Sequence, residues 1–346
     1  KKYISLDTEF IRTNTFYPKP ALIQLYDGSD VYLIDPLQIS DFSSFKNLLV
    51  SEEVLKVMHS SSEDIEVFLH LLGCCPKPIV DTQLAASMVG LDFSISYQRL
   101  VKEILNKDLI KSETRSDWLR RPLSNDQINY AIEDVVWLLD IYIVLDERLE
   151  SLGRTHWLKE DCDNIIKKAE LPINLSMYYT KVKSANKLRP KELSLLRDIC
   201  IWREEKARNL DIPRNRVASD SELLNIILRK IDSVDDFVSK KIFCSKRINL
   251  YAKEILEILK EISLTTQDKL PMPLKKKSSS ARKNLKEMKE LVNRLAKTIA
   301  IPEALLASKK DLEALVLSSN PTDEDLLKGW RGEILRKEIK NNCLKI

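Results

Sequence analysis

Two carboxylates stand one residue apart near the start of the chain. Asp7 and Glu9 belong to the run Leu-Asp-Thr-Glu-Phe, within a segment, residues 3–11, whose composition predicts a β-strand. Side chains at positions i and i+2 of a strand point to the same face. Buried carboxylates need a positive partner, and a divalent cation would supply one, since oxygen ligands suit Mg²⁺ and Mn²⁺. The alternative is a solvent-facing acidic pair at a strand end.

Three further residues could complete such a site. Asp64 falls in the first turn of a predicted helix, where the helix dipole favours an anionic side chain. Tyr130 and Asp134 are four residues apart in another predicted helix and share one face. Taken singly, Asp64 could merely favour a helix N-terminus and Tyr130 could be a core aromatic residue. The order Asp-x-Glu, then Asp, then Tyr-x-x-x-Asp is far more specific than its parts.

The elements that must position these residues alternate between strand and helix over the first 150 residues. Apolar patterning and turn residues predict strands at residues 21–25, 31–34, 55–58 and 79–80, the first two joined as a hairpin. The same criteria predict helices at residues 42–49, 62–72 with a cap from serines 60–62, 82–89, and one long helix from Ser124 through Tyr142. This order predicts an α/β domain with a mixed central sheet.

Beyond residue 150 the strand signal fades and amphipathic helices follow. Their predicted ranges are 192–209, 220–231, 248–262, 282–299, 303–316 and 323–341. Two junctions nearly repeat, because Ile-Pro, four residues and Ala-Ser occur both at 212–219 and at 301–308. A matching Leu follows each, at Leu223 and Leu312. We therefore expect two copies of one small helical domain, with residues 275–280 as a solvated linker between them.

Charge is distributed unevenly along the 346 residues. Residues 1–150 carry 15 Lys and Arg against 24 Asp and Glu, whereas the remainder carries 41 against 28. An acidic half could concentrate metal ions, and a basic half could attract polyanions such as nucleic acid. No apolar run reaches the length of a membrane span and no signal peptide is evident, and the 6 Cys match neither a zinc site nor a disulfide framework. We expect a cytoplasmic protein with reduced thiols.

The combined pattern resembles the DEDD superfamily of 3′→5′ exonucleases, in the branch with Tyr-x-x-x-Asp in the third motif. The resemblance is closest to the bacterial ribonuclease D family, and it covers nearly the whole chain. The segments that carry it are residues 6–10, 59–69, 81–83, 112–119, 130–135 and, near the C-terminus, 329–333. The resemblance implies a ribonuclease H-like nuclease domain, a mixed sheet flanked by helices, followed by two all-α HRDC-type domains. We place these domains at residues 1–160, 189–267 and 268–346, with 161–188 as a connecting segment.

The family further implies a chemistry and a substrate. Asp7, Glu9, Asp64 and Asp134 would hold two divalent ions, Mg²⁺ or Mn²⁺, for hydrolysis of the last phosphodiester of RNA into nucleoside 5′-monophosphates. Tyr130 would position the attacking water or the phosphate, since a phenol with a pKa near 10 is a poor base. Partners would be RNAs with an accessible 3′ end, tRNA precursors above all, bound by a monomer without an obligate protein partner. A DNA 3′→5′ exonuclease and a catalytically silent nucleic-acid adaptor are the alternatives.

Residues near the expected catalytic site could also contact the RNA. The resemblance and the mix of charge with aromatic surface suggest a set of five residues: Thr8, His59, Arg115, Trp118 and Arg121. His59 could equally be a satisfied core histidine, and Trp118 could equally serve packing. Arg120 shares the basic character of its neighbours. Asp81 is expected to cap a helix or support the site rather than bind metal.

Overall fold

The computed structural model describes residues 2–109, 116–263, 270–272, 278–318 and 320–341. The chain divides into two compact units. The first comprises Lys1–Ile11, Pro18–Leu171 and Lys277–Ile346, and the second comprises Arg12–Tyr17 and Pro172–Lys276. The second of the two predicted helical copies therefore belongs to the same unit as the N-terminal α/β domain. Within the described ranges, no helix is both long enough and apolar enough to cross a membrane.

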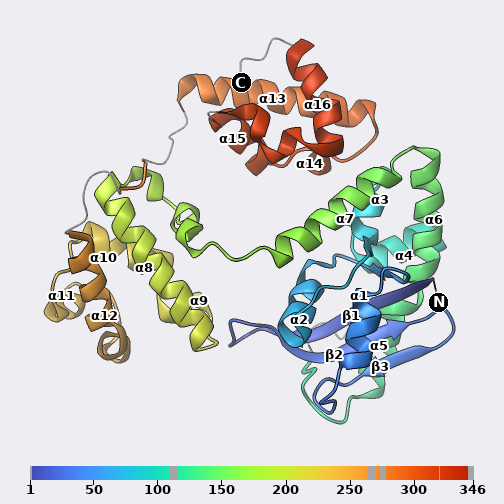
Figure 1. Ribbon diagram of the computed structural model, residues 1–346, viewed down its shortest axis with the longest axis horizontal. Coiled ribbons are helices and arrows are strands. Elements are labelled where there is room, and N and C mark those ends of the chain that lie inside the picture. Colours follow the sequence, from blue (N-terminus) through green and yellow to red (C-terminus); the bar gives the residue numbers. More distant parts are fainter. Residues whose placement is uncertain (1, 110–115, 264–269, 273–277, 319, 342–346) are drawn as a thin grey trace. The chain divides into compact units, whose positions relative to one another are not determined.

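Five strands of the first unit form one mixed sheet, in the order β3-β2-β1-β4-β5 (Figure 1). The strands are β1 (Tyr3–Ile11), β2 (Lys19–Tyr26), β3 (Val31–Ile34), β4 (Leu55–Met58) and β5 (Ile79–Asp81). Strand β1 is central, because it pairs antiparallel with β2 and parallel with β4. Antiparallel pairing of β2 with β3 confirms the predicted hairpin, and the whole arrangement confirms the mixed sheet.

Among the described residues up to 171, seven helices accompany this sheet. They are α1 (Ser43–Val50), α2 (Ser62–Leu72), α3 (Thr82–Met88), α4 (Tyr97–Leu105), α5 (Asn125–Val136), α6 (Leu138–Ser151) and α7 (Thr155–Glu170). Helix α5 packs across β1, β2 and β3, whereas α7 packs against β5 and α2. The predicted connecting segment begins at residue 161, inside α7, so its first ten residues are helical and belong to the first unit.

The prediction of one long helix from Ser124 through Tyr142 is wrong, because the helix ends at Val136 and a new one begins at Leu138. The last carbonyls of a helix need partners from outside it. The Ser5 hydroxyl donates to the carbonyl of Val135 over 2.7 Å, and the Tyr97 hydroxyl donates to that of Glu133 over 2.9 Å. The apolar periodicity of the sequence continues through this break and does not reveal it. The two residues that bond to the end of α5 lie far away in the chain, so no local pattern indicates them.

The prediction that serines 60–62 cap α2 is also wrong in its details. Ser61 occupies the N-cap position, but its side chain makes no capping bond. Its amide and hydroxyl both donate to Oδ2 of Asp81, over 2.8 and 2.9 Å. Asp81 instead caps α3, accepting from the amides of Gln83 and Leu84. This confirms that Asp81 supports the start of two helices.

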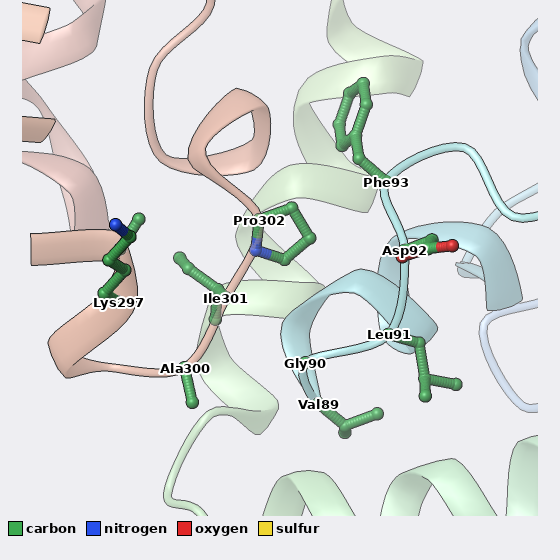
Figure 2. A pocket seen from close by; sticks show the side chains of 10 residues that line it. Val89, Gly90, Leu91, Asp92, Phe93, Lys297, Ala300, Ile301 and Pro302 are labelled. Carbon is green, nitrogen blue, oxygen red and sulfur yellow. The ribbon is translucent and has the colours of Figure 1, made fainter. Parts of the chain in front are cut away.

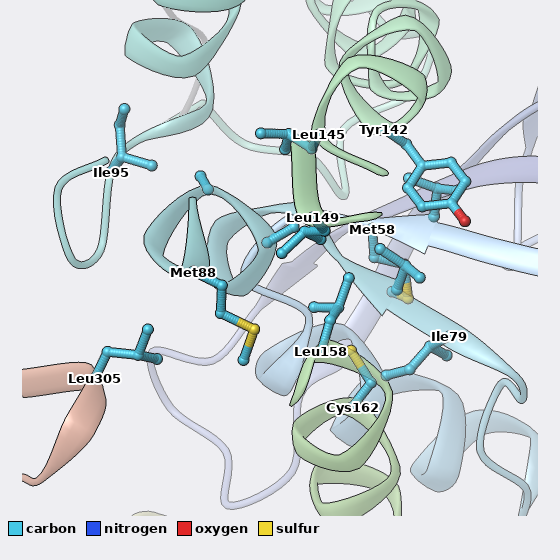
Figure 3. Close-up of a cluster of buried hydrophobic side chains, with 14 of the residues drawn as sticks. Met58, Ile79, Met88, Ile95, Tyr142, Leu145, Leu149, Leu158, Cys162 and Leu305 are labelled. Carbon is cyan, nitrogen blue, oxygen red and sulfur yellow. The ribbon is translucent and has the colours of Figure 1, made fainter. Parts of the chain in front are cut away.

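The main hydrophobic core of the first unit lies between the sheet and helices α3, α6 and α7 (Figure 3). Met58 from β4, Leu145 from α6 and Leu158 from α7 are all buried there. The core continues into the second helical copy, since Leu305 belongs to the same cluster and is only 3% exposed. The α/β domain and this copy therefore share one apolar core, which explains why they form one unit.

In the described part of the second helical copy there are four α-helices and two short 3₁₀ turns. The elements are α13 (Ser279–Thr298), α14 (Glu303–Leu306), α15 (Lys309–Leu317), the turns Pro321–Asp323 and Asp325–Leu327, and α16 (Gly329–Asn341). The helix predicted at 303–316 is thus two helices, and the one predicted at 323–341 begins only at Gly329. Ser278 caps α13 through the amide of Ala281, so the predicted linker ends there, and its residues 275–277 lie outside the described residues.

The motif at residues 329–333 fastens this copy to α7. Trp330 stacks on Trp157 with ring centroids 4.4 Å apart, and its indole N–H donates to Asp161. Arg331 forms two parallel hydrogen bonds to the same carboxylate, 2.6 and 2.8 Å long. Gly329 has a φ of +53°, where a side chain would be strained, and a Cβ there would also displace the carboxylate of Glu160 that accepts from the amide of Trp330. These contacts give the C-terminal motif a structural role.

A second contact lies beside the loop that follows α3 (Figure 2). Gly90 has a φ of +95°, and a Cβ there would come within 2.9 Å of the carbonyl oxygen of Ala300. Arg154, which is buried, donates to the carbonyls of Met88 and Ile299 and so connects the same two segments. The backbone at Gly90 lies directly against the backbone at Ala300, which leaves no room for a side chain at residue 90.

The described residues of the second unit form helices joined by loops. Its elements are the 3₁₀ helices Leu175–Lys181 and Ala185–Lys187, then α8 (Pro190–Asn209), α9 (Arg214–Val217), α10 (Asp220–Leu228), α11 (Val234–Ser239) and α12 (Ser245–Ser263). Helices α9 and α11 are too short to show a periodic pattern and were not predicted. Residues 12–17 complete this unit, with Phe16 buried in its hydrophobic core.

The internal repeat is confirmed in three dimensions. In both copies Ile-Pro precedes a single helical turn, α9 or α14, after which an Ala in extended conformation leads into a capped helix. Ala218 has φ −159° and ψ 133°, and Ala307 has φ −157° and ψ 121°. Ser219 and Ser308 then form capping boxes with Glu222 and Asp311. The two junctions are the same structure.

Candidate active site

Three of the four predicted acids meet at the C-terminal part of β1. One carboxylate oxygen each of Asp7, Glu9 and Asp134 lies within 4.8 Å of the other two. Asp7 and Glu9 share a face of β1, and the register with β2 shifts directly after Glu9, which marks a bulge. Asp134 comes from α5, which packs on β1. These contacts bring together acids that lie about 125 residues apart in the sequence.

Asp64, the fourth acid, lies in the first turn of α2 and is 7% exposed. The hydroxyl of Thr8, the residue between Asp7 and Glu9, donates a hydrogen bond to Oδ1 of Asp64. This bond fastens α2 to β1 and orients the carboxylate. Thr8, predicted as an RNA contact, thus has a positioning role within the site.

The acids disturb one another electrostatically. Burial raises the pKa of Asp7 well above its ordinary value, and the charges of Asp64, Asp134 and Glu9 raise it further. Burial, with the charges of Asp134 and Asp64, raises the pKa of Glu9 to about 9. Burial likewise raises the pKa of Asp64 and of Asp134 to about 7. Four such groups cannot all be ionised near pH 7 without a positive charge between them.

Tyr130 lies one helical turn before Asp134 on α5 and bonds to its carboxylate through the phenol hydroxyl. Burial raises the pKa of Tyr130 above its ordinary value, and the charges of Asp134 and Glu9 add to the increase. The phenol therefore stays protonated and can act as a hydrogen-bond donor.

Gln24 gives independent evidence that the site accommodates a polar ligand. Its side chain is fully buried, and among the described residues neither amide atom has a hydrogen-bond partner. Gln24 lies opposite Asp7 in the β1–β2 ladder, so the two side chains share a face of the sheet. An orphaned buried amide beside carboxylates fits a hydrated divalent cation, whose waters would satisfy it. Gln24 was not predicted, although a polar residue amid the apolar strand at 21–25 was the available signal.

Tyr97 and Ser5 are two further supporting residues that the sequence did not reveal. Both hold the end of α5, as described above, and so fix the position of Asp134 over β1. The Tyr97 ring also packs against His59, with centroids 5.6 Å apart. Nothing in the local sequence of either residue marks this role.

His59 is better explained as a structural residue than as an RNA contact. Its Nδ1 lies 2.9 Å from the Thr82 hydroxyl, and its Nε2 lies 3.0 Å from the carbonyl of Ile95. Burial lowers the pKa of the imidazole, which favours the neutral form with Nε2 donating to that carbonyl. Both ring nitrogens are thus occupied within the protein.

Trp118 and Arg121 also serve packing. Trp118 is 2% exposed and lies against Tyr130, with ring centroids 6.0 Å apart, so its ring offers no face to a base. All five N–H donors of Arg121 bond within the protein, two to Asp35 and three to the carbonyls of Ala21, Trp118 and Arg120. Arg121 thus holds the loop before α5 against β2, and Trp118 packs against the ring of Tyr130. Arg115 lies outside the described residues.

Replacing Arg121 with Lys will lower the free energy of unfolding by about 1–3 kcal/mol, because one ammonium group cannot reproduce five planar bonds and leaves buried carbonyls unpaired. Urea unfolding measures this change. Arg120→Lys, at an exposed neighbouring position, is the matched control and should leave stability unchanged. Unchanged stability of Arg121→Lys together with weaker RNA binding would instead restore Arg121 as an RNA contact.

Comparison with known families covers the same three regions. Residues 1–150 match the 3′-5′ exonuclease family. Residues 192–259 match the HRDC domain, and residues 280–339 match the C-terminal HRDC domain of ribonuclease D. The matched ranges correspond to the α/β domain and to the two helical copies.

Individual relatives match over nearly the full chain. Ribonuclease D of Pseudomonas paraeruginosa is 38% identical, covering 98% of this chain and 91% of the relative. Ribonuclease D of Escherichia coli K12 is 33% identical, covering 98% and 92%. The crystal structure of Escherichia coli RNase D, described as an exoribonuclease involved in structured RNA processing, matches with a TM-score of 0.92 at 32% identity, again covering 98% and 92%. The chain therefore belongs to the ribonuclease D family of exoribonucleases.

Proposed function

We propose that this protein trims RNA from the 3′ end by hydrolysis, using two divalent cations held by Asp7, Glu9, Asp64 and Asp134. The observation that carries the proposal is that the carboxylates of Asp7, Glu9 and Asp134 converge, with Asp64 near enough for its charge to act on all three. Desolvation and repulsion between acidic groups raise the pKa of each of the four. Bound Mg²⁺ or Mn²⁺ would supply an activated water and offset the charge that gathers on the phosphate. Carboxylate oxygens and the orphaned amide of Gln24 suit such hard cations.

The protein's own side chains would orient the reaction. Tyr130 stays protonated, and its hydroxyl faces Asp134. Once a cation occupies the Asp134 carboxylate, the same O–H would be able to turn and donate to the attacking water or to a phosphate oxygen instead. Thr8 holds Asp64 in place. Products would be nucleoside 5′-monophosphates. Preorganised groups of this kind lower the barrier because they need not move when charge develops.

The 3′ ends of tRNA precursors are the proposed physiological substrate, acted on in the cytoplasm. The family supports this, and so does the positive balance of residues 151–346, which would attract structured RNA through salt-sensitive contacts. None of the five described cysteines forms a disulfide, which agrees with a reducing compartment. Family membership and an intact set of catalytic residues argue against the silent adaptor.

A paired digestion tests the proposal against the DNA alternative. RNA and DNA of one sequence, each labelled at the 5′ end, are incubated with the protein and Mg²⁺. We expect a ladder that shortens from the 3′ end, with RNA degraded faster than DNA. Faster degradation of DNA would favour the DNA exonuclease, and neither substrate being shortened would favour the adaptor.

A further inference from the structure

A basic pocket lies in the second unit, apart from the carboxylate cluster. It has a volume of 500 Å³ and is formed by the loop after β1 together with helix α9. The residues that matter are Arg12 and Phe16 from the loop and Arg214, Asn215 and Arg216 from α9. Its volume falls within the range of roughly 300–1,000 Å³ typical of small-ligand sites, so a nucleotide-sized group fits.

The pocket is held in shape by specific contacts. Asp211 accepts hydrogen bonds from the amides of Phe16 and Tyr17, each 3.0 Å long, which fixes the loop beside α9. The Nε of Arg12 donates to the carbonyl of Phe16, closing the loop on itself. Arg216 donates to the side chain of Asn14 from the other side. These hydrogen bonds therefore hold the backbone that carries the arginines in place.

Positive charge exceeds negative charge at this place. Buried Glu204 bonds to Arg214, and Arg203 and Arg208 also approach it within 4 Å, at 3.8 and 3.7 Å. Asp220 pairs with Arg203 over 2.6 Å, which leaves Glu204 facing Arg208 and Arg214, and one carboxylate cannot neutralise two guanidinium groups. Arg216 is exposed and adds to the excess. Arginine in a positive pocket is suited to phosphate, whose oxygens accept two parallel N–H bonds.

The internal repeat shows that the backbone turn itself does not require arginines. The second copy has the same backbone turn, but Glu303, Ala304 and Leu305 stand where the first copy has Arg214, Asn215 and Arg216. Leu305 is 3% exposed and belongs to the core of the first unit. The same turn thus serves packing in one copy and presents two arginines and an amide in the other.

Only a few residues of the chain separate Arg12 of this pocket from the carboxylates of β1. Arg12 follows Glu9 by three residues, so their Cα atoms can be at most about 11 Å apart. Stacked nucleotides advance about 3.4 Å along one strand, so this reach corresponds to about three nucleotides. A group bound beside Arg12 would therefore belong to the same RNA strand, just upstream of its 3′ end.

We propose that the pocket of Arg12, Asn215 and Arg216 binds a backbone phosphate of the RNA strand, upstream of the 3′-terminal nucleotide. The inference rests on the proposed function, since it assumes an RNA strand whose 3′ end lies at the carboxylates. Arg214 already bonds to Glu204. It adds positive charge to the pocket and holds α9 against α8. The contact holds the strand in place without reading its sequence.

The test uses the full chain with Asp7→Asn, so that RNA is not degraded during binding. Affinity for a ten-nucleotide RNA is measured across a range of KCl concentrations, with and without the pair Arg12→Gln and Arg216→Gln. The pair should weaken binding by about tenfold, because charge-assisted hydrogen bonds to the phosphate are removed. It should also reduce the slope of log K against log[KCl] by about 0.7 for each phosphate that the protein no longer neutralises. The weakening should be smaller for a dinucleotide, which ends before the pocket.

Two controls make the result decisive. Arg229→Gln, an exposed arginine on the same unit outside the pocket, should change the slope little. The pair Arg12→Lys and Arg216→Lys keeps the charges and should retain most of the slope. Equal slopes for the Gln pair and Arg229→Gln would overturn the inference, as would an equal weakening on the dinucleotide or a full reduction of the slope in the Lys pair. Failure of the chain with Asp7 intact to shorten RNA would instead overturn the proposed function.

Discussion

Replacing Asp7 with Asn will slow the release of 3′-terminal nucleotides by about 10³-fold or more, on the scale of removing a principal electrostatic stabiliser of the transition state. The reason is the position of Asp7 among the other three acids, each of which contributes to raising its pKa. Asn keeps the shape but removes the charge that would hold a cation. The measurement is the rate of nucleotide release from 3′-labelled RNA in Mg²⁺.

Binding should survive this substitution even though hydrolysis does not. Removing one negative charge from a site that must accept a phosphate lowers repulsion, so the affinity of Asp7→Asn for RNA should equal or exceed that of the unsubstituted protein. Asp140→Asn, at an exposed position on α6, is the matched control and should retain full activity. Activity of Asp7→Asn within tenfold of the control would show that the carboxylate cluster is not the site of hydrolysis.

Mg²⁺ will stabilise the protein strongly at pH 8.5 and scarcely at pH 5.5. The folded pKa values of Asp64 and Asp134 are raised to about 7 and that of Glu9 to about 9, whereas unfolded carboxyl groups titrate near pH 4. Between pH 4 and pH 9 the folded state thus binds more protons than the unfolded state. Without metal, the contribution of these three acids to stability is fully present at low pH and is lost as pH rises through this window.

The cation reverses this fall in stability because it binds the deprotonated acids. At a Mg²⁺ concentration about 100 times Kd the gain is about 2.7 kcal/mol, or an increase in Tm of roughly 5–10 °C. At pH 5.5 protons occupy the same oxygens, so the increase should be less than about 1 °C. Thermal unfolding at both pH values, with KCl at matched ionic strength as the control, measures the difference. An equal increase at both pH values, or an increase that persists in Asp7→Asn, would contradict the assignment of the cation to this cluster.

Local sequence was sufficient to predict the acids and the strands. Asp7 and Glu9 sit in a short apolar strand, and Tyr130 and Asp134 in a periodic helix, so neighbouring residues determine their faces. The repeat was also predictable, because the Ile-Pro and Ala-Ser residues specify the turn and the helix cap in both copies.

Tertiary contacts decided the features that the sequence did not predict. The break after Val136 depends on Ser5 and Tyr97, and neither can be linked to α5 by spacing. Trp118 and Arg121 combine an aromatic ring with charge, which is typical both of RNA contacts and of a packed loop. Only burial and the bonds of Arg121 to Asp35 and to backbone carbonyls distinguish the two.

The sharing of one core by the α/β domain and the second helical copy was likewise not predictable. Leu305 falls in a predicted amphipathic helix and Trp330 in the C-terminal motif at 329–333, and neither pattern indicates that both residues are buried in the core of the first unit. Deleting the second copy would expose that core, so truncation cannot separate RNA binding from folding. Point substitutions such as those at Arg12 and Arg216 keep the core intact and are the better probes.

The identity of the first product is the sharpest test of hydrolysis at the four carboxylates. RNA labelled in its 3′-terminal nucleotide is incubated with metal-free protein, and Mg²⁺ is then added. We expect that no label is released before the addition and that afterwards the label appears at once as a nucleoside 5′-monophosphate. Release without a divalent cation, or label that first appears in longer fragments, would contradict metal-dependent hydrolysis from the 3′ end.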